Sequence, residues 1–374
     1  MPQKNDDRWI KTNYPEIMFE NTSVGRLKKE VWDADEDQID KILAEYGIPS
    51  PSELGIPGTY IQNTPRAKVV ERRCKNDIVL VPLGCTENHG MHSNSGLDTF
   101  MVSQMLEGVR RYTARRGCEC TLAFSPLNYG GHPYHHIGMP GTINMPHEVV
   151  VENLIYAMAG LWNDGFRKII LVNNHGQSWM IETAIHEFFK RFQVPGIIRY
   201  VDWHRASREF WTPVAERDNW VETPFLHADE SETSTGLLLF PDMLDMNYAV
   251  DSWGVSYLAD EHFDMPIDCY RRPSRFSEGE GQSAIEIMGT PKGVVGAATK
   301  ARKEKARRPV SFFMKYLTLL HDQILEKYPA GKLPPSDMLT MRTEEELRPY
   351  LKEPQSEGWK SIYQLPRLGV FEKL

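Results

Sequence analysis

Carboxylates and imidazoles, two side-chain types that commonly bind divalent metals, gather in three short clusters of this sequence. The first cluster contains Glu87 and His89, directly after the apolar run 78–83, and Asp98, which lies eleven residues beyond Glu87. Side chains two positions apart in an extended segment share a face, so Glu87 and His89 can point at one ion. The small polar loop before Asp98 can fold this carboxylate back toward the pair. In the alternative interpretation, these are ordinary loop residues and Asp98 only caps a helix.

The second cluster also follows an apolar run, at 169–172, and contains His175 within Asn-Asn-His-Gly-Gln. Two strand ends of one parallel sheet can converge on a single crevice, so His175 can join the first three candidate ligands. Gly176 permits close approach of the backbone. Gln177 begins a predicted helix whose N–H groups can hold an anionic oxygen. The alternative is a simple turn that changes the direction of the chain.

The third cluster places four acidic or imidazole side chains within six residues ahead of an apolar helix, namely His227, Asp229, Glu230 and Glu232. If that helix begins near Asp229, Glu232 lies one turn inside it, and Asp229 or Ser231 can cap it. Capping alone explains some of these carboxylates. His227 precedes the cap and has no such structural purpose, which makes it a candidate acid or base near neutral pH.

A loop rich in histidine and tyrosine lies between the first two clusters. It contains Tyr129, His132 and His136 among glycines and prolines, a composition that suits a pocket that forms hydrogen bonds with a polar substrate. We assign these three residues to substrate binding, together with Gln177 and Trp179 beside the second cluster. The alternative is a histidine-rich metal-binding tract.

Carboxylate and imidazole ligands without thiolate favour zinc or manganese, with iron as a further candidate. Asp98 could bridge two ions through its two carboxylate oxygens, because paired catalytic ions lie about 3.5–4 Å apart. The sequence is therefore compatible with one or two divalent ions.

Short β-branched runs alternate with longer amphipathic runs from residue 77 onward, which predicts an α/β fold with a mostly parallel sheet. The predicted strands are Ile78–Leu83, Thr121–Phe124, Lys168–Val172 and Gly196–Val201. The predicted helices are Asp98–Arg115, His147–Asp164, Gln177–Phe192 and Glu230–Phe240. A late strand or loop is expected at Gly289–Ala298, before a basic helix that begins near Lys300.

Three segments are expected along the chain. Residues 1–70 form an N-terminal extension with a charged helix at Asp33–Tyr46, followed by a stretch rich in proline and glycine. Residues 71–327 form the catalytic domain. Residues 328–374, rich in proline and charge, form a C-terminal extension that packs on this domain or on a neighbouring subunit.

Composition narrows the range of partners. The 374 residues carry a formal net charge of -8 without a long block of either sign, which argues against nucleic acid or an anionic membrane surface and favours a small-molecule substrate. The five cysteines contain no CxxC pair, which fits a reduced cytoplasm. Residues 1–14 are polar, without the apolar segment of a secretion signal, and the sequence contains no apolar stretch long enough to span a membrane.

Taken together and in this order, the clusters resemble the creatininase family of metal-dependent hydrolases. That family has a strand ending in P-x-G-x-x-E-x-H-G with an aspartate eleven residues after the glutamate, then H-x-x-F-P-G-T, N-G-H-G and H-A-G-x-x-E-T-S. The corresponding segments here are PLGCTENHG at 82–90 with Asp98, HIGMPGT at 136–142, NNHG at 173–176 and HADESETS at 227–234.

The resemblance covers about residues 77–300 and implies a three-layer α/β/α sandwich on a mostly parallel sheet, often assembled as a homo-oligomer. It places Glu87, His89, Asp98 and His175 on metal-ligand positions. Glu232 matches the glutamate of the E-T-S element, a further ligand or catalytic residue, and His227 matches a histidine implicated in proton transfer.

Two departures bear on the substrate. Creatininase itself has a glutamate ligand where this chain has Gln177, and Asp229 replaces the usual glycine of H-A-G. The longer chain, with its tyrosine- and histidine-rich loop, looks most similar to the branch that opens 3-dehydro-scyllo-inosose, a diketo-inositol, in inositol catabolism. The expected activity is therefore carbon–carbon hydrolysis with metal-activated water. The alternatives are hydrolysis of a C–N bond in a cyclic amide or formamide, and a non-catalytic metal- or sugar-binding protein.

Overall fold

The computed structural model describes residues 8–13, 18–35, 37–38, 56–125, 127–132, 138–211, 213, 218–253, 292–335 and 340–367. The chain divides into two compact units, Met1–Pro57 and Gly58–Leu374. The larger unit contains every residue of the three sequence clusters.

The N-terminal unit contains an antiparallel hairpin followed by a helix. Strand β1 (Trp9–Lys11) pairs with β2 (Met18–Glu20), and α1 spans Ser23–Asp33. The Thr22 hydroxyl caps α1 by accepting a hydrogen bond from the Gly25 N–H, as short hydroxyl side chains commonly do. The predicted helix Asp33–Tyr46 lies largely outside the described residues.

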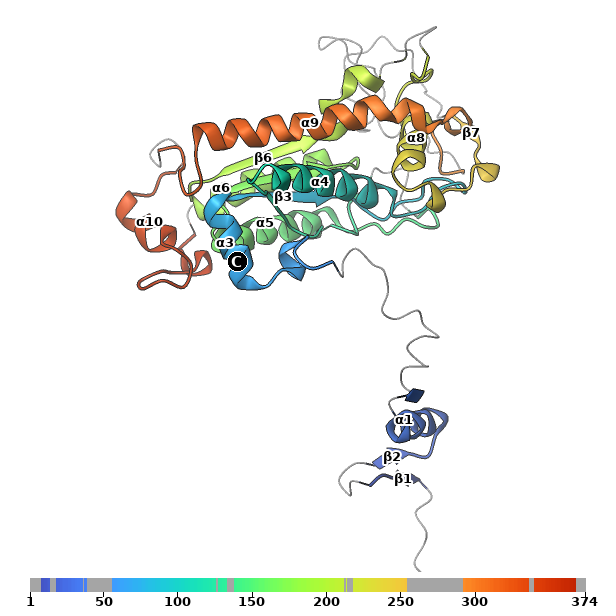
Figure 1. Ribbon diagram of the computed structural model, residues 1–374, viewed down its shortest axis with the longest axis horizontal. Coiled ribbons are helices and arrows are strands. Elements are labelled where there is room, and N and C mark those ends of the chain that lie inside the picture. The colour runs from blue at the N-terminus through green and yellow to red at the C-terminus, as the bar shows by residue number, and fades with distance from the viewer. Residues whose placement is uncertain are drawn as a thin grey trace, which may run out of the picture. The chain divides into compact units, whose positions relative to one another are not determined.

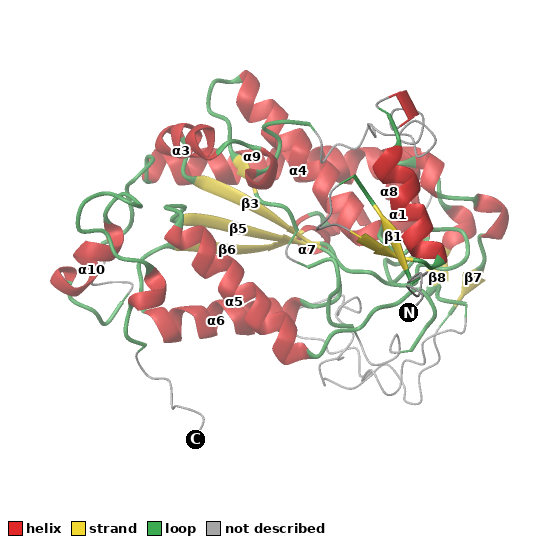
Figure 2. Ribbon diagram, turned by 90° about the horizontal axis from the view of Figure 1, so that it is seen from below, coloured by secondary structure: helices red, strands yellow, loops and turns green. Residues whose placement is uncertain are grey.

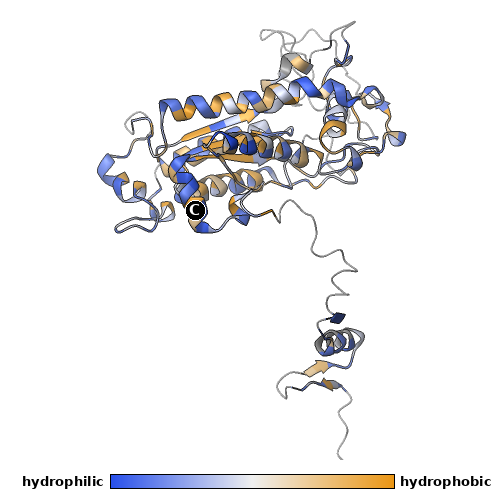
Figure 3. Cartoon of the chain, in the orientation of Figure 1, coloured by the Kyte–Doolittle hydropathy of each residue, from blue (hydrophilic) through white to orange (hydrophobic). Residues whose placement is uncertain are grey.

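A parallel sheet forms the centre of the larger unit (Figure 1). Its strands are β3 (Ile78–Leu83), β4 (Thr121–Leu122), β5 (Lys168–Asn173) and β6 (Ile197–Asp202), in the order β4-β3-β5-β6. Every residue of β3 and β5 is buried, which is expected of parallel strands covered on both faces. Figure 3 shows the hydrophobic colouring of these central strands.

Alternate residues of the central strands enter two separate cores. Val79 and Val81 of β3 pack in one core with α5 (His147–Asn163) and α6 (Ser178–Phe192). Ile78 and Leu80 pack in the other core with α4 (Leu97–Arg115) and α9 (Lys303–Lys327). Figure 2 shows these helix pairs on opposite faces of the sheet. This arrangement confirms the predicted α/β/α sandwich.

Two predicted elements end earlier than expected. Strand β4 ends at Leu122, although the Ala123 N–H still donates to the Leu80 carbonyl at 3.0 Å, and the Phe124 N–H donates to Gln62 Oε1. Helix α8 (Glu230–Leu239) stops at Leu239 because Phe240 precedes a proline and adopts a non-helical conformation with φ of -152° and ψ of 66°, as proline disfavours a helical residue before it.

Shorter elements complete the described chain. The remaining helices are η2 (Ile61–Asn63), α3 (Arg66–Lys75), α7 (Trp203–Ala206), η4 (Arg208–Trp211), α8 (Glu230–Leu239), η5 (Pro241–Met243), η6 (Met246–Tyr248), η7 (Ala298–Lys300), α10 (Glu344–Leu351) and η9 (Ile362–Gln364). Strands β7 (Asp251–Ser252) and β8 (Gly296–Ala297) form an antiparallel pair. Among the described helices, none is both long and apolar enough to cross a lipid bilayer.

The segments that flank the sandwich in sequence also contribute to its cores. Tyr60, ahead of α3, lies in the core under α9, and its hydroxyl donates to Glu107 Oε1 at 2.5 Å. Leu347 and Tyr350 of α10 lie in the core under α5 and α6, and Arg73 of α3 forms an ion pair with Glu353. Residues 340–367 therefore pack on the sandwich.

Candidate metal centre

Neighbouring strand ends bring the first two clusters together. Leu83 and Asn173, the last residues of β3 and β5, are register partners, and the Asn174 N–H donates to the Leu83 carbonyl at 3.0 Å. The loops that begin there therefore start side by side, at the carboxyl edge of the sheet where ligands bind in open α/β folds.

A glycine allows the first turn of α4 to approach this edge. A Cβ on Gly84 would lie 2.5 Å from the Thr99 backbone nitrogen, closer than a real side chain can lie. Asp98 is in that first turn, but α4 begins at Leu97 with Gly96 at the cap position. The Asp98 carboxylate points into the cluster, where its Oδ2 accepts from the Cys85 thiol at 3.0 Å. Asp98 therefore does not cap α4.

The third cluster reaches the same place through the start of α8. Asp229 caps this helix by accepting from the Ser231 and Glu232 N–H groups. Ala228 adopts a left-handed conformation with φ of 47°, and its N–H donates to Glu232 Oε2 at 2.6 Å. His227 is held by backbone hydrogen bonds with Val295 in both directions. The strained turn thus positions Glu232 and His227 together.

Asp98 faces two imidazoles through different oxygens. Its Oδ1 lies 3.4 Å from His89 Nε2, and its Oδ2 lies 3.2 Å from His175 Nδ1. Glu87 Oε2 lies 3.0 Å from the same nitrogen of His175. On the opposite side, Glu232 Oε2 lies 3.7 Å from His89 Nε2. The structure therefore brings together all five residues that the sequence predicts as metal ligands, and all five are buried.

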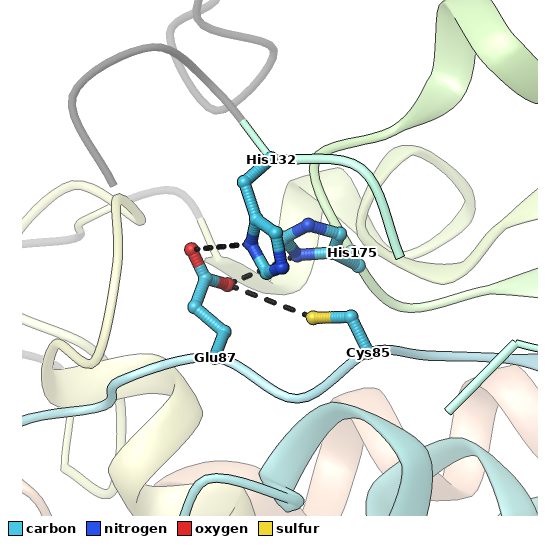
Figure 4. A group of neighbouring side chains, drawn as sticks. All are labelled: Cys85, Glu87, His132 and His175. Atoms are coloured by element: carbon cyan, nitrogen blue, oxygen red, sulfur yellow. Dashed lines mark hydrogen bonds and ion pairs between the residues drawn. The ribbon is translucent and has the colours of Figure 1, made fainter. Parts of the chain in front are cut away.

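Two further imidazoles border the cluster. His132 Nδ1 lies 3.6 Å from Glu87 Oε1, and Figure 4 shows its ring beside His175, both turned toward the Glu87 carboxylate. His227 Nδ1 lies 3.9 Å from Glu87 Oε2 and also 3.9 Å from Glu232 Oε2. The sequence analysis assigns His132 to substrate binding, but in the structure its Nδ1 faces the Glu87 carboxylate of the cluster.

The four imidazoles are held in the same way. One ring nitrogen of each lies at hydrogen-bond distance from a backbone carbonyl, and the other faces the carboxylates. The pairs are His89 with Glu87 O at 3.0 Å, His132 with Ile143 O at 3.1 Å, His175 with Gly131 O at 2.9 Å and His227 with Asn88 O at 2.8 Å. Because a carbonyl can only accept, the outer nitrogen carries the hydrogen. Metal-binding histidines are commonly oriented in this manner.

Without a metal, the electrostatics hold protons on the inner imidazoles. Burial disfavours a charged His89, but the Asp98 carboxylate outweighs burial and raises the pKa of His89 to about 10. Burial likewise opposes a charge on His175, and Glu87 and Asp98 raise its pKa to about 10. Burial also raises the pKa of Glu232 well above its ordinary value. The buried carboxylates of the cluster thus favour positively charged groups next to them.

The spacing of the donor atoms fits a divalent ion. Two donors at about 2.0–2.1 Å from one tetrahedral ion lie about 3.3 Å apart, which resembles the separations in this cluster. His89 Nε2, His132 Nδ1 and Glu232 Oε1 are buried and form no hydrogen bond with a described residue, which is costly unless another group binds them. The residues therefore fit a metal.

The candidate donors form overlapping sets, in each of which all atoms lie within 4.8 Å of one another. One set contains His89, Asp98 and Glu232, and we call it the carboxylate-rich set. Another contains Glu87, His132 and His175, with Cys85 at its edge; we call these three residues the imidazole-rich set. A third set, Glu87 with His89 and His227, overlaps both.

The other predicted substrate residues have different surroundings. Gln177 is buried, and its amide donates to the Gly84 carbonyl at 3.1 Å and to Asn173 Oδ1 at 3.2 Å. Tyr129 is 53% exposed. Trp179 lies in the first turn of α6 with its ring edge-on to His147, at a centroid distance of 5.8 Å. His136 lies outside the described residues.

The sequence interpretation missed the supporting polar residues. The Cys85 thiol holds Asp98, and Asn174 Nδ2 donates to the Asp98 backbone carbonyl at 3.1 Å. Asn88 Nδ2 donates to the Pro140 carbonyl at 2.6 Å, which ties the first cluster to the following loop. Cys85 lies two residues before Glu87, so their shared face in an extended segment was the available signal.

A parallel sheet between helical layers, with buried carboxylates and imidazoles at its carboxyl edge, suits an enzyme that uses a divalent metal. The family model described as creatininase, creatinine amidohydrolase, matches residues 63–320. The chain belongs to the creatininase family and is a hydrolase.

Two curated relatives have different activities in their names. A 3-dehydro-scyllo-inosose hydrolase of Thermotoga maritima is 44% identical over 306 residues, which cover 82% of this chain and 96% of the relative. A creatinine amidohydrolase of Pseudomonas putida is 23% identical over 225 residues, which cover 57% of this chain and 82% of the relative.

Solved structures share the fold. A creatinine amidohydrolase structure matches with a TM-score of 0.54 at 18% identity, covering 74% of this chain and 98% of that chain. A Bacteroides fragilis protein named as a putative creatinine amidohydrolase matches with a TM-score of 0.53 at 20% identity, covering 71% and 96%. The solved creatininases include a zinc–zinc type and a manganese form, which supports a divalent metal as the cofactor in this family.

Proposed function

We propose that this protein opens the ring of 3-dehydro-scyllo-inosose by carbon–carbon hydrolysis, as a step of inositol catabolism. The observation that carries the proposal is the 44% identity to the Thermotoga maritima hydrolase of that substrate, across 96% of that protein. The creatinine amidohydrolase relative is more distant, at 23% identity over 57% of this chain. Hydrolysis of a C–N bond is therefore the weaker alternative.

We assign the metal to Glu87, His89, Asp98, His175 and Glu232, as one or two ions of zinc or manganese, with iron as a further candidate. Such an ion, when bound, lowers the pKa of water and polarises a carbonyl oxygen. The contribution of the chain is a buried set of ligands whose positions are fixed before the substrate arrives. The carbonyl partners of His89 and His175 fix the direction of their rings, and the Cys85 thiol and Asn174 fix Asp98.

In the proposed reaction, the oxygen of one water molecule forms a bond with a ring carbonyl carbon. The bond from that carbon to the carbon between the two carbonyl groups then breaks, and the first carbon becomes a carboxylate. The electron pair stays on the other carbon as an enolate of the second carbonyl and takes up a proton. Water is the only co-reactant.

His227 is the candidate for moving that proton. Its Nε2 is held by the Asn88 carbonyl at 2.8 Å, and its Nδ1 lies 3.9 Å from carboxylate oxygens of Glu87 and of Glu232. An imidazole fixed at one nitrogen and facing the reacting region with the other can accept a proton from water and return it to carbon. Glu232, opposite His227, is the second candidate for proton transfer.

Substrate hydroxyl groups require hydrogen-bonding partners near this centre. We assign this function to Tyr129, Gln177 and Trp179, and to His136 outside the described residues. The buried Oε1 of Gln177 forms no hydrogen bond with a described residue, which supports its availability to a ligand.

The proposal is tested with purified protein loaded with zinc or manganese in H₂¹⁸O. 3-Dehydro-scyllo-inosose should be consumed, and one ¹⁸O atom should appear in the new carboxylate by mass spectrometry. The Glu87→Gln variant should be inactive, whereas a matched change of the exposed carboxylate Asp242 to Asn should have no effect. Turnover of creatinine or a formamide without turnover of the diketone would instead support C–N hydrolysis. Diketone binding without turnover would support a non-catalytic protein.

We also propose a homo-oligomer in the cytoplasm, with a catalytic domain at 71–327 between two extensions. Exposed aromatic rings support an interface between copies, since Tyr156 of α5 stacks on Tyr363 at a centroid distance of 6.4 Å, and both are exposed. The described cysteines are free thiols, as expected in a reducing compartment. Light scattering in solution tests the assembly.

A further inference from the structure

We propose that His132 is a metal ligand and that, with Glu87 and His175, it binds one of the ions of the centre. The inference rests on the proposed function in one respect, that the protein binds a divalent metal at this cluster. It reassigns His132, which the sequence places in the substrate pocket, to the metal itself.

The first argument is the direction of the ring. His132 Nε2 lies 3.1 Å from the Ile143 carbonyl, so this outer nitrogen carries the hydrogen. In a neutral ring, Nδ1 then has a lone pair, and this nitrogen faces Glu87 Oε1 at 3.6 Å. That separation is too long for a good hydrogen bond. It is close to the separation of about 3.3 Å between two donors of one tetrahedral ion.

The second argument is the degree of burial. The His132 side chain is fully buried, and its Nδ1 forms no hydrogen bond with a described residue. A buried, unsatisfied nitrogen among carboxylates requires a partner, and a cation meets both the charge and the size of the site.

The third argument is that the local chain positions His132 and His175 as a pair. The Gly131 carbonyl accepts from His175 Nε2 at 2.9 Å, and the His132 N–H donates to Asn144 Oδ1 at 3.1 Å. The two rings are edge-to-face with centroids 4.7 Å apart, and Figure 4 shows both directed at the Glu87 carboxylate. One short segment, residues 131–132, therefore fixes both imidazoles.

Asp98 can contribute a carboxylate oxygen beside His175, but two other neighbours, Cys85 and Gln177, are less suitable as donors. The Cys85 thiol donates its hydrogen to Asp98 Oδ2 at 3.0 Å, so in this arrangement it supports Asp98. Gln177 is neutral, and its amide nitrogen is directed to Gly84 and Asn173. With His132 as a ligand, the imidazole-rich set offers two nitrogens and one carboxylate, a combination that favours zinc or ferrous iron over magnesium or calcium.

The test is metal binding by the full-length protein. His132→Ala should lower the affinity for one ion by more than about 100-fold, because loss of even an outer partner of a ligand costs about 10–100-fold. Affinity and stoichiometry are measured with zinc by competition against a chromophoric chelator and by elemental analysis after dialysis. The matched control is His92→Ala, which removes another buried imidazole, 2.9 Å from Thr233 Oγ1 and outside the donor sets.

A second variant gives a direct signature. His132→Cys, loaded with Co²⁺, should show a new thiolate-to-cobalt charge-transfer band in the near ultraviolet, which wild type and a His92→Cys variant should lack. A structural role for His132 would not produce this band. Unchanged zinc affinity in His132→Ala, together with no band in His132→Cys, would overturn the proposal.

These measurements separate the two proposals. Wild-type protein that binds metal through His132 but leaves the diketone intact retains this inference and loses the proposed substrate. Wild-type protein that turns over the diketone while His132→Ala binds zinc normally retains the proposed function and loses this inference. Wild-type protein that binds no divalent metal removes both.

Discussion

The carboxylate-rich set and the imidazole-rich set differ in their number of carboxylates, although they lie next to each other in the same cluster. His89, Asp98 and Glu232 would offer two carboxylates to an ion, whereas Glu87, His132 and His175 would offer one carboxylate and two imidazoles. A divalent ion bound only by the first set would be neutralised by its ligands, whereas one bound only by the second set would keep a positive charge and polarise a carbonyl oxygen more strongly. Sharing Asp98 between two ions would reduce this difference in charge. This difference in charge predicts different functions for the carboxylate-rich set and the imidazole-rich set.

Asp98 lies between the halves, so its loss should have the largest effect. Its two oxygens face His89 and His175 separately. We expect Asp98→Ala to reduce kcat/KM by more than about 1,000-fold and to weaken both ions, because a shared ligand of a two-ion centre is removed. Elemental analysis and steady-state kinetics measure this, with Asp242→Asn as the control. Loss of only one ion would show that Asp98 belongs to one set alone.

His227 faces both sets but is assigned to neither as a ligand. His227→Asn should lower kcat by about 100–10,000-fold, the usual contribution of a general acid or base. Metal content should stay at the wild-type value, since the proposed ligands remain. A parallel fall in metal content and kcat would make His227 a ligand and would enlarge the carboxylate-rich set.

Substitution of Glu232 should affect only the ion in the carboxylate-rich set. Glu232→Gln removes the charge and keeps the shape, so we expect about 10–100-fold weaker binding of the ion in the carboxylate-rich set. The second ion should bind as before, which a two-step zinc titration can resolve. Glu87→Gln should give the reverse pattern. Equal weakening of both ions by either variant would contradict two separable sets.

The smallest expected effect is a pH dependence that is steeper for the carboxylate-rich set. His89 and His175 hold protons up to about pH 10 in the metal-free protein, because the neighbouring carboxylates outweigh burial and raise the pKa of each ring. An ion must displace these protons, so affinity rises with pH by about tenfold per unit for each proton released. Burial also raises the pKa of Glu232. Below that pKa, the carboxylate-rich set must therefore release a second proton when an ion binds.

Zinc titrations between pH 5 and 8 measure these slopes. Affinity that falls as pH rises across this range would contradict the proton competition. Identical slopes for the two ions would show that Glu232 releases no proton.

The sequence predicted the parts of the molecule that follow from periodicity. Continuous apolar runs identified β3 and β5, because parallel strands buried on both faces need apolar residues throughout. Polar residues placed directly after these runs also predicted which loops would meet. The adjacency of Leu83 and Asn173 is a geometric consequence of two neighbouring parallel strands.

The role of His132 could not be predicted in the same way. It lies in a loop without periodicity, where the direction of a side chain depends on contacts such as Met145 N–H with the Gly130 carbonyl and His132 N–H with Asn144. The hydrogen bond from the Phe124 N–H to Gln62, which is distant in sequence, is a contact of the same kind. Such tertiary contacts are not encoded in local pattern.

The imidazole–carbonyl hydrogen bonds also have a consequence for how the protein folds. They join residues 2, 11, 44 and 139 positions apart, and contacts at large sequence separation form slowly because a long loop must close first. We therefore expect the His227 contact with Asn88 to form late in folding. The rate of metal binding in a refolding experiment would then report on this late step.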